Sequence, residues 1–370
     1  MTLTNYWWLL IWLAIGGAGI RFVFPKKTEM VLGKPRVRWS ATASILLVLP
    51  LILWAGFRPV NLPGFDTSAY VDVFRAAPST LDKLPEYLTT ITKDKGFSVL
   101  TVLLKAVVGD SPELYLLVIA AFQFLCVALV FRKYSCDYWL SIFIFVASTE
   151  YISWMYNGIR QFTAVAAIFA ASALLFRKKY ISLILIILLA NTIHGSVLLM
   201  LPIIFIVQGK AFNSKTLLCV CVIAIALLCV NQFTDLLEAL LSNTQYQNVV
   251  SDWKTFNDDG MNPLRALIYS LPAIFAILGR RFIRKEQEPV IHIAANASVI
   301  TAALSWLATV TSGIFIGRLP ILVSLYATGI LLPWEINTFF TQKSARFIKA
   351  ITLLCYAVFF YYQMHTWRIM

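Results

Sequence analysis

Residues 177–210 read RKKYISLILIILLANTIHGSVLLMLPIIFIVQGK, an apolar run with basic residues at both ends and a polar break at 191–196. The run is too long for one ordinary helical crossing of a bilayer, which takes about 20 residues. Lys and Arg favour the cytoplasmic side of a membrane, and here they lie both before and after the run. The stretch therefore predicts a re-entrant helical hairpin (about 180–207) that enters and leaves on the cytoplasmic side.

The rest of the chain is also apolar. Of its 370 residues, 59% are hydrophobic and 13% are charged, whereas soluble domains carry about a quarter charged residues. The sequence predicts an all-α integral membrane protein with about ten transmembrane helices besides the hairpin, folded as a single polytopic membrane domain of residues 1–370. The predicted crossings lie near 6–24, 40–57, 113–131, 138–156, 158–176, 217–232, 264–283, 290–312, 319–336 and 347–365.

The formal net charge of +13 follows the predicted topology. Lys and Arg lie in short clusters between apolar runs and not on one basic face, which argues against a nucleic-acid partner. With the hairpin in place, the cluster at 280–285 returns to the cytoplasm and the positive excess is cytoplasmic. Both termini and two long loops, about 58–96 and 231–262, then face outward, and these outer-face loops are long enough to hold short helices.

The polar break in the hairpin indicates a cavity. Non-helical backbone at membrane depth is tolerated only where protein buries it or water reaches it. Each arm has about 13 residues and reaches roughly 20 Å from the cytoplasmic surface at 1.5 Å per residue. We therefore expect residues 191–196 to line a cavity that opens outward.

Ionisable residues near the predicted outer ends of helices are candidate functional groups, because intramembrane charge is costly. Arg160 and Arg318 each lie at the predicted outward-facing start of an apolar helix, where the helix N-terminus adds positive potential and N–H donors for an anion. His194 at the hairpin tip is a candidate acid or base, and Glu150 lies one or two helical turns from the Arg160 segment. Alternatives stay open: each arginine can reach lipid headgroups, His194 can close the break by hydrogen bonding, and Glu150 can pair with an arginine.

An ordered set of short motifs resembles the EpsG family of Wzy-type bacterial polysaccharide polymerases. The motifs run from about residue 66 to 333, and Lys95 departs from the acidic pattern expected before Gly96. They are Phe65-Asp66-Thr67-Ser68-Ala69-Tyr70, Lys95-Gly96-Phe97, Asn157-Gly158-Ile159-Arg160-Gln161, Leu189-Ala190-Asn191-Thr192-Ile193-His194-Gly195-Ser196 and Gly317-Arg318.

This resemblance implies a GT-C-like glycosyltransferase architecture in the bacterial cytoplasmic (inner) membrane, with the active site facing the periplasm or cell exterior. It implies transfer of a growing glycan from undecaprenyl diphosphate to a lipid-linked acceptor unit, without cofactor or metal. The product would be O-antigen, capsule or exopolysaccharide. Membrane lipids, a chain-length regulator and a flippase are the partners that it implies.

The resemblance also implies roles for individual residues. Arg160 and Arg318, with Arg75, would bind the diphosphate, because a diphosphate leaving group needs fixed positive charge. His194 ranks first as the base, followed by Asp66 and Glu150, and the substrate-binding residues would be Tyr70, Asn157 and Gln161. One alternative is an O-antigen ligase, which uses the same donor. Another is a lipid-linked oligosaccharide flippase or secondary transporter, since broken helices also mark transport sites.

Overall fold

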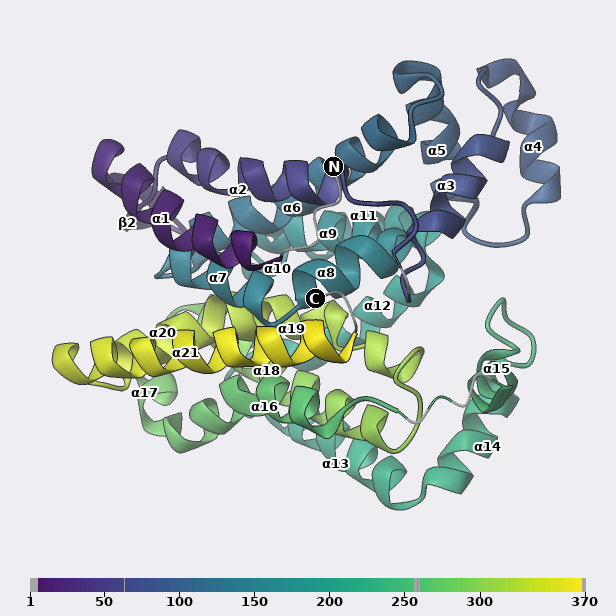
Figure 1. The fold of residues 1–370 in the computed structure, drawn as a ribbon. Helices are drawn as coiled ribbons and strands as arrows, with labels where there is room; N and C mark the ends of the chain where they lie inside the picture. Colours follow the sequence, from purple (N-terminus) through teal and green to yellow (C-terminus); the bar gives the residue numbers. More distant parts are fainter. Residues whose placement is uncertain (1–5, 63, 256–257, 259, 368–370) are drawn as a thin grey trace. The chain divides into compact units, whose positions relative to one another are not determined.

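The computed structural model describes residues 6–62, 64–255, 258 and 260–367. The described chain is helical apart from one two-stranded antiparallel hairpin (Figure 1). It forms two compact units, one made of Met1–Leu199 with Arg346–Met370 and the other of Met200–Ala345. The single polytopic domain stays a prediction, and the two units are described one at a time.

In the first unit, α6 packs along α2 and α9 and forms the centre of the helix packing. Its elements are α1 (Trp7–Val23), β1 (Lys27–Val31), β2 (Lys34–Arg38), α2 (Ala41–Gly56), α3 (Thr67–Ala76), η1 (Leu81–Lys83), α4 (Leu84–Thr90), α5 (Lys95–Val108), α6 (Pro112–Tyr134), α7 (Tyr138–Ala147), α8 (Glu150–Ile152), η2 (Ser153–Asn157), α9 (Ile159–Ala170), α10 (Ser172–Phe176), α11 (Tyr180–Ile193), η3 (Gly195–Leu199) and most of α21 (Gln342–Thr366).

In the second unit, α18 packs against α13, α16 and α19. Its elements are α12 (Met200–Val207), α13 (Ser214–Leu228), α14 (Val230–Leu241), α15 (Val249–Thr255), α16 (Pro263–Leu278), α17 (Arg280–Lys285), α18 (Pro289–Thr309), η4 (Ile316–Arg318), α19 (Ile321–Tyr326), η5 (Ala327–Leu331) and α20 (Leu332–Thr338).

Several helices are long and apolar enough to cross a membrane. Within the described residues these are Pro112–Tyr134, Pro289–Thr309, Ile316–Thr338 and Gln342–Thr366, with a fifth if the bent pair α13 and α14 counts as one span. Seven shorter apolar helices of 10–17 residues accompany them. The chain is thus a helical membrane protein, and the count of about ten crossings stays a prediction.

Backbone breaks interrupt several of the predicted crossings within the described residues. The run 138–156 breaks after α7, where Thr149 takes a left-handed conformation with φ 67° before α8 begins. The run 158–176 divides into α9 and α10 at Ala171. The run 217–232 bends by 109° at Cys229 between α13 and α14. Hydropathy measures only apolar content, so it could not locate these backbone breaks.

The β1–β2 hairpin is a departure from the all-α prediction. Both central residues of its turn, Leu32 and Gly33, have positive φ, at 50° and 82°, as a type I′ turn requires. Arg132, at the end of α6, makes an ion pair with Glu29 and donates to the carbonyl of Trp39. The hairpin is therefore fastened to the end of α6.

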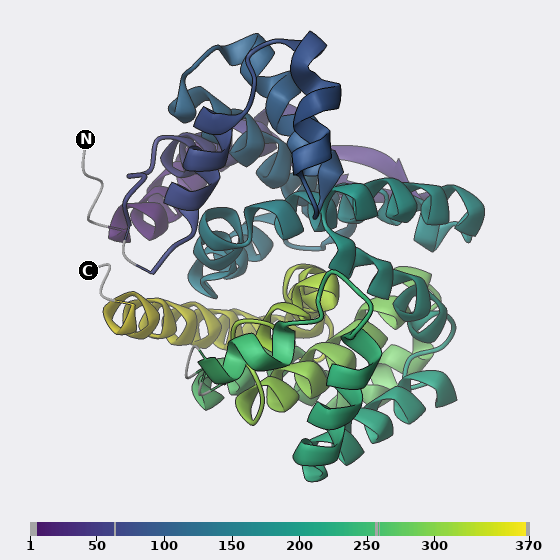
Figure 2. The same ribbon diagram turned by 90° about the vertical axis from the view of Figure 1, so that its right-hand side faces the viewer.

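The first loop (about 58–96) forms short helices as predicted. Its helices α3 and α4 lie beside α5 at the end of the first unit away from the β1–β2 hairpin (Figure 1). This end faces the viewer in Figure 2. The second loop (231–262) also forms short helices, α14 and α15.

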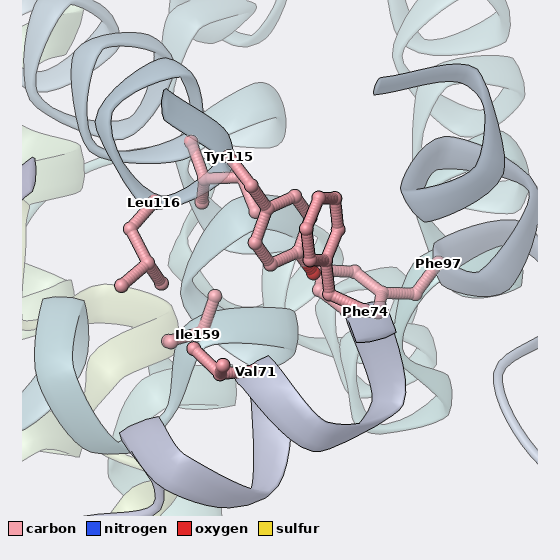
Figure 3. Packing of buried hydrophobic residues seen from close by; sticks show 7 residues of the cluster. Val71, Phe74, Phe97, Tyr115, Leu116 and Ile159 are labelled. Carbon is pink, nitrogen blue, oxygen red and sulfur yellow. The ribbon is translucent and has the colours of Figure 1, made fainter. Parts of the chain in front are cut away.

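A buried apolar cluster fixes α3 and α5 against α6 and α9. Figure 3 shows Val71 and Phe74 from α3, Phe97 from α5, and Tyr115 and Ile159 from α6 and α9. The rings of Phe74 and Tyr115 stack with centroids 4.4 Å apart. Because these side chains are at most 3% exposed, the cluster holds the first loop close to the residue that precedes Arg160.

Candidate functional site

Arg160 lies in the first turn of α9 and forms an ion pair that the sequence did not predict. Its Nη1 is 3.2 Å from Oδ2 of Asp94, whose side chain is 7% exposed while that of Arg160 is 39% exposed. The other carboxylate oxygen of Asp94 accepts a hydrogen bond of 3.2 Å from the backbone N–H of Gly195. One aspartate thus connects Arg160 with the break between α11 and η3.

Local backbone geometry brings Asp94 to this position. Asp94 precedes α5 in a left-handed conformation with φ 52°, which aspartate tolerates better than most residues. The next turn contains Gly96, where an added Cβ would lie 2.2 Å from Oγ1 and 2.7 Å from the carbonyl carbon of Thr192. Gly96 therefore allows α5 to approach the end of α11 closely, and this packing explains the Gly-Phe motif.

His194 lies directly after α11, which continues through residues 191–193, so the helix breaks at His194 within the predicted stretch 191–196. Nδ1 of His194 is 2.8 Å from Oγ of Ser196, and Nε2 of Gln161 donates to the same oxygen at 3.1 Å. Ser196 thereby joins the histidine to the residue that follows Arg160. The re-entrant hairpin itself stays a prediction, because α12, its second arm, belongs to the other unit.

Aromatic and polar contacts tie the first loop to the same place. The guanidinium carbon of Arg160 lies 5.8 Å from the ring centroid of Tyr70, within the range of a cation–π contact. The backbone N–H of Asp66 donates to Oδ1 of Asn157 at 3.2 Å, and Asp66 itself is exposed. Tyr70 and Asp66 of the first loop thus lie close to the segment that contains Asn157 and Arg160.

Two predicted site residues lie elsewhere in the first unit. Arg75 is on an exposed part of α3, where it pairs with Asp72 at 3.6 Å in an i, i+3 arrangement. Glu150 begins α8 and its side chain is fully buried.

A buried lysine sets the position of α3. Nζ of Lys105 donates to the carbonyl oxygens of Phe74, Arg75 and Ala77 at 3.1, 2.8 and 2.7 Å. These carbonyls belong to the last turn of α3 and its C-cap, which lack partners within the helix. Lys105 therefore fixes the C-terminal end of the helix that carries Tyr70.

Arg318 belongs to the second unit, in the 3₁₀ turn η4. The preceding turn is held by Asp258, whose carboxylate accepts hydrogen bonds from the N–H groups of Gly313 and Ile314, both at 2.9 Å, and from the Ser312 hydroxyl. Gly260 donates a further bond at 3.1 Å. The two-arginine arrangement predicted from sequence spans both units, so it stays a prediction.

The hydrogen bonds to Asp258 affect its ionisation. Burial raises the pKa of this carboxyl, but hydrogen bonds from Ser312 and from the N–H groups of Ile314, Gly313 and Gly260 outweigh burial and lower the pKa below the usual value of 3.8. The Asp258 carboxylate is thus occupied by donors of the chain itself.

The Arg160 site, defined here as Asp94, Arg160, Gln161, His194 and Ser196, combines a half-exposed guanidinium with an imidazole. It can bind an anion at Arg160 and transfer a proton at His194. The sequence interpretation missed Asp94 and Ser196. An aspartate just before a helix is a capping signal that could have drawn attention to Asp94.

Comparison with known proteins adds one finding to this geometry. The model of the EpsG family matches residues 42–368, which include the Arg160 site, the first loop and Arg318. No curated protein and no solved structure matched the chain significantly. Because the family model covers nearly the whole sequence, the chain belongs to the EpsG family.

Proposed function

We propose that this protein polymerises undecaprenyl-diphosphate-linked oligosaccharide repeat units on the outer face of the bacterial cytoplasmic membrane. The growing glycan passes from its lipid diphosphate to a lipid-linked acceptor unit. The observation that carries the proposal is the Arg160 site, in which a guanidinium suited to a diphosphate lies next to the break that bears His194. Membership of the EpsG family supports the same reaction class.

The reaction requires charge stabilisation at the leaving group. An acceptor hydroxyl oxygen attacks the anomeric carbon, the bond from this carbon to the diphosphate oxygen breaks, and undecaprenyl diphosphate leaves with one more negative charge. Arginine binds phosphate oxygens through two parallel N–H donors. We assign Arg160 and Arg318 to the diphosphate, and Asp94 to holding the Arg160 guanidinium in position.

The acceptor hydroxyl must lose its proton during the attack. We assign His194 as the base, because Ser196 contacts Nδ1 and thereby orients the ring. Asp66, exposed in the first loop, is second, and the buried Glu150 is third. No metal or other cofactor has a role in this scheme.

Substrate-binding roles go to residues around the arginine. Tyr70 presents an aromatic ring beside Arg160, Asn157 orients the start of α3 through Asp66, and Gln161 holds Ser196. Arg75 is exposed on α3, so we assign it to attracting the anionic headgroup before binding.

The test is a reconstitution. The purified protein is placed in liposomes with lipid-linked repeat units isolated from a polymerase-deficient host, and no nucleotide sugar is added. A ladder of lengthened lipid-linked glycans is the expected result. A flippase would move the units across the bilayer without lengthening them, and a ligase would transfer glycan only after a different acceptor is supplied. Either result would overturn the proposal.

A further inference from the structure

Arg58 in the first unit is a buried arginine without an acidic partner among the described residues. Arg58 follows α2 and is 4% exposed, and none of the described carboxylates forms an ion pair with it. A buried charge without a counter-ion is costly, so its position needs compensating contacts. These come from Tyr156, Thr67 and the backbone.

Each contact of Arg58 reaches a different segment. Nη1 donates to the carbonyl oxygen of Ala55 at the end of α2. Nε donates to Oγ1 of Thr67, the first residue of α3, at 3.1 Å. The guanidinium carbon lies 4.7 Å from the ring centroid of Tyr156 in η2, so one side chain links α2, α3 and η2.

The link continues through Thr67. Its hydroxyl accepts from Arg58 and donates to the carbonyl oxygen of Tyr156 at 2.9 Å. Thr67 and Tyr156 are both fully buried, which makes these bonds stronger than exposed ones. The neighbouring bond from Asp66 N–H to Asn157 Oδ1 adds a second connection between the same two segments.

The two linked segments lead to Tyr70 and to Arg160, which contact each other. The first segment begins α3, the helix that carries Tyr70. The second segment ends at Asn157, and only Gly158 separates it from α9, which carries Arg160. We propose that Arg58 is a positioning residue that clamps the start of α3 onto η2 and so fixes Tyr70 against Arg160. The effect of Arg58 on catalysis rests on the proposed polymerase function, whereas its effect on the packing of α3 against η2 does not.

The test uses Arg58→Met and Thr67→Val, which remove the clamp at either end. Thr90→Val is the matched control, because the Thr90 hydroxyl bonds only its own helix turn, at the carbonyl of Tyr87. Amide hydrogen exchange of the reconstituted protein should become at least about tenfold faster in residues 66–70 and 153–160 and stay unchanged in α6. Unchanged exchange in both variants would overturn the proposal, and Thr67→Val keeps the test valid if Arg58→Met does not fold.

Kinetics then separate positioning from direct binding. We expect kcat for chain extension to fall about tenfold in Thr67→Val, with KM for the lipid-linked unit within about twofold of wild type. A large rise in KM with unchanged exchange would contradict positioning, because the substituted residue would then be binding substrate itself. If the exchange result holds but the wild-type protein does not extend chains, the proposed function fails and the clamp stands.

Discussion

Asp94 in the first unit and Asp258 in the second both anchor a segment that carries an arginine, but they do so differently. Asp94 contacts the guanidinium of Arg160 directly and accepts one backbone N–H. Asp258 accepts two backbone N–H groups and one hydroxyl from the turn before Arg318, and a third N–H from Gly260 in its own loop. Asp94 therefore contacts the charged group of Arg160 directly, whereas Asp258 stabilises the backbone of the turn that precedes Arg318.

The largest expected effect comes from removing either arginine. Arg160→Gln and Arg318→Gln should each lower kcat for chain extension by on the order of 1000-fold, because each removes charge stabilisation from the leaving diphosphate. Rates are measured with purified protein and lipid-linked repeat units. Arg280→Gln, an exposed arginine in α17, is the control and should be neutral. An effect at Arg160 alone would restrict the diphosphate site to the first unit.

The next effect concerns His194, the proposed proton acceptor in the Arg160 site. His194→Gln should lower kcat about 100-fold and change the dependence of kcat on pH, since glutamine cannot take up a proton. The measurement is kcat as a function of pH. A variant that keeps the wild-type pH profile would reduce His194 to a hydrogen-bonding residue at the helix break.

Asp94→Asn is the substitution that most directly sharpens the comparison. Asparagine can still accept the Gly195 N–H but loses the ion pair, so we expect about a tenfold lower kcat with normal folding. In a double-mutant cycle with Arg160→Gln the two effects should not add, because they share one interaction. Asp258→Asn should lower kcat less than Asp94→Asn does. Additive effects of Asp94 and Arg160 would show that the pair does not act as a unit.

Gly96→Ala tests the close approach that brings Asp94 to the site. A Cβ there would meet Thr192 at 2.2 Å, so we expect a loss of stability of about 1–3 kcal/mol from overpacking. Thermal unfolding in detergent is the measurement. Gly19→Ala is the matched control, since an added Cβ at this position in α1 has nothing within 4 Å. Equal unfolding temperatures for the two variants would contradict the packing account.

The smallest effect is a pH dependence in the second unit. The hydrogen-bonded Asp258 has a pKa below 3.8. A carboxylate whose folded pKa is depressed stabilises the structure above its ordinary pKa, and this stabilisation is lost as the pH falls through the folded value. Amide protection at Gly313 and Ile314 should therefore stay constant from about pH 8 to 5 and fall in stronger acid, after correction for intrinsic exchange. Asp258→Asn should show weaker protection and no acid step.

Parts of this architecture followed directly from sequence patterns. The polar break in the 180–207 run predicted the end of α11, and the turn signals around Asn157 predicted a helix start beside Arg160. Both features depend on local chemistry, namely the loss of apolar periodicity and the presence of glycine. The short helices of the first loop were predicted from its length in the same way.

Other features depend on contacts between distant residues. Asp94 meets Arg160 and Gly195 only because Gly96 lets α5 approach α11, and no local pattern encodes that approach. Arg58 looked like an ordinary residue at the end of a span, because its partners Thr67 and Tyr156 are brought to it only by folding.

The central claim is that Arg160 holds the diphosphate of the lipid-linked substrate. Equilibrium binding of undecaprenyl diphosphate to the purified protein tests it without requiring turnover. We predict that Arg160→Gln weakens binding at least tenfold, about 1.4 kcal/mol, while Arg280→Gln binds like wild type. Equal affinity of Arg160→Gln and wild type would contradict the account.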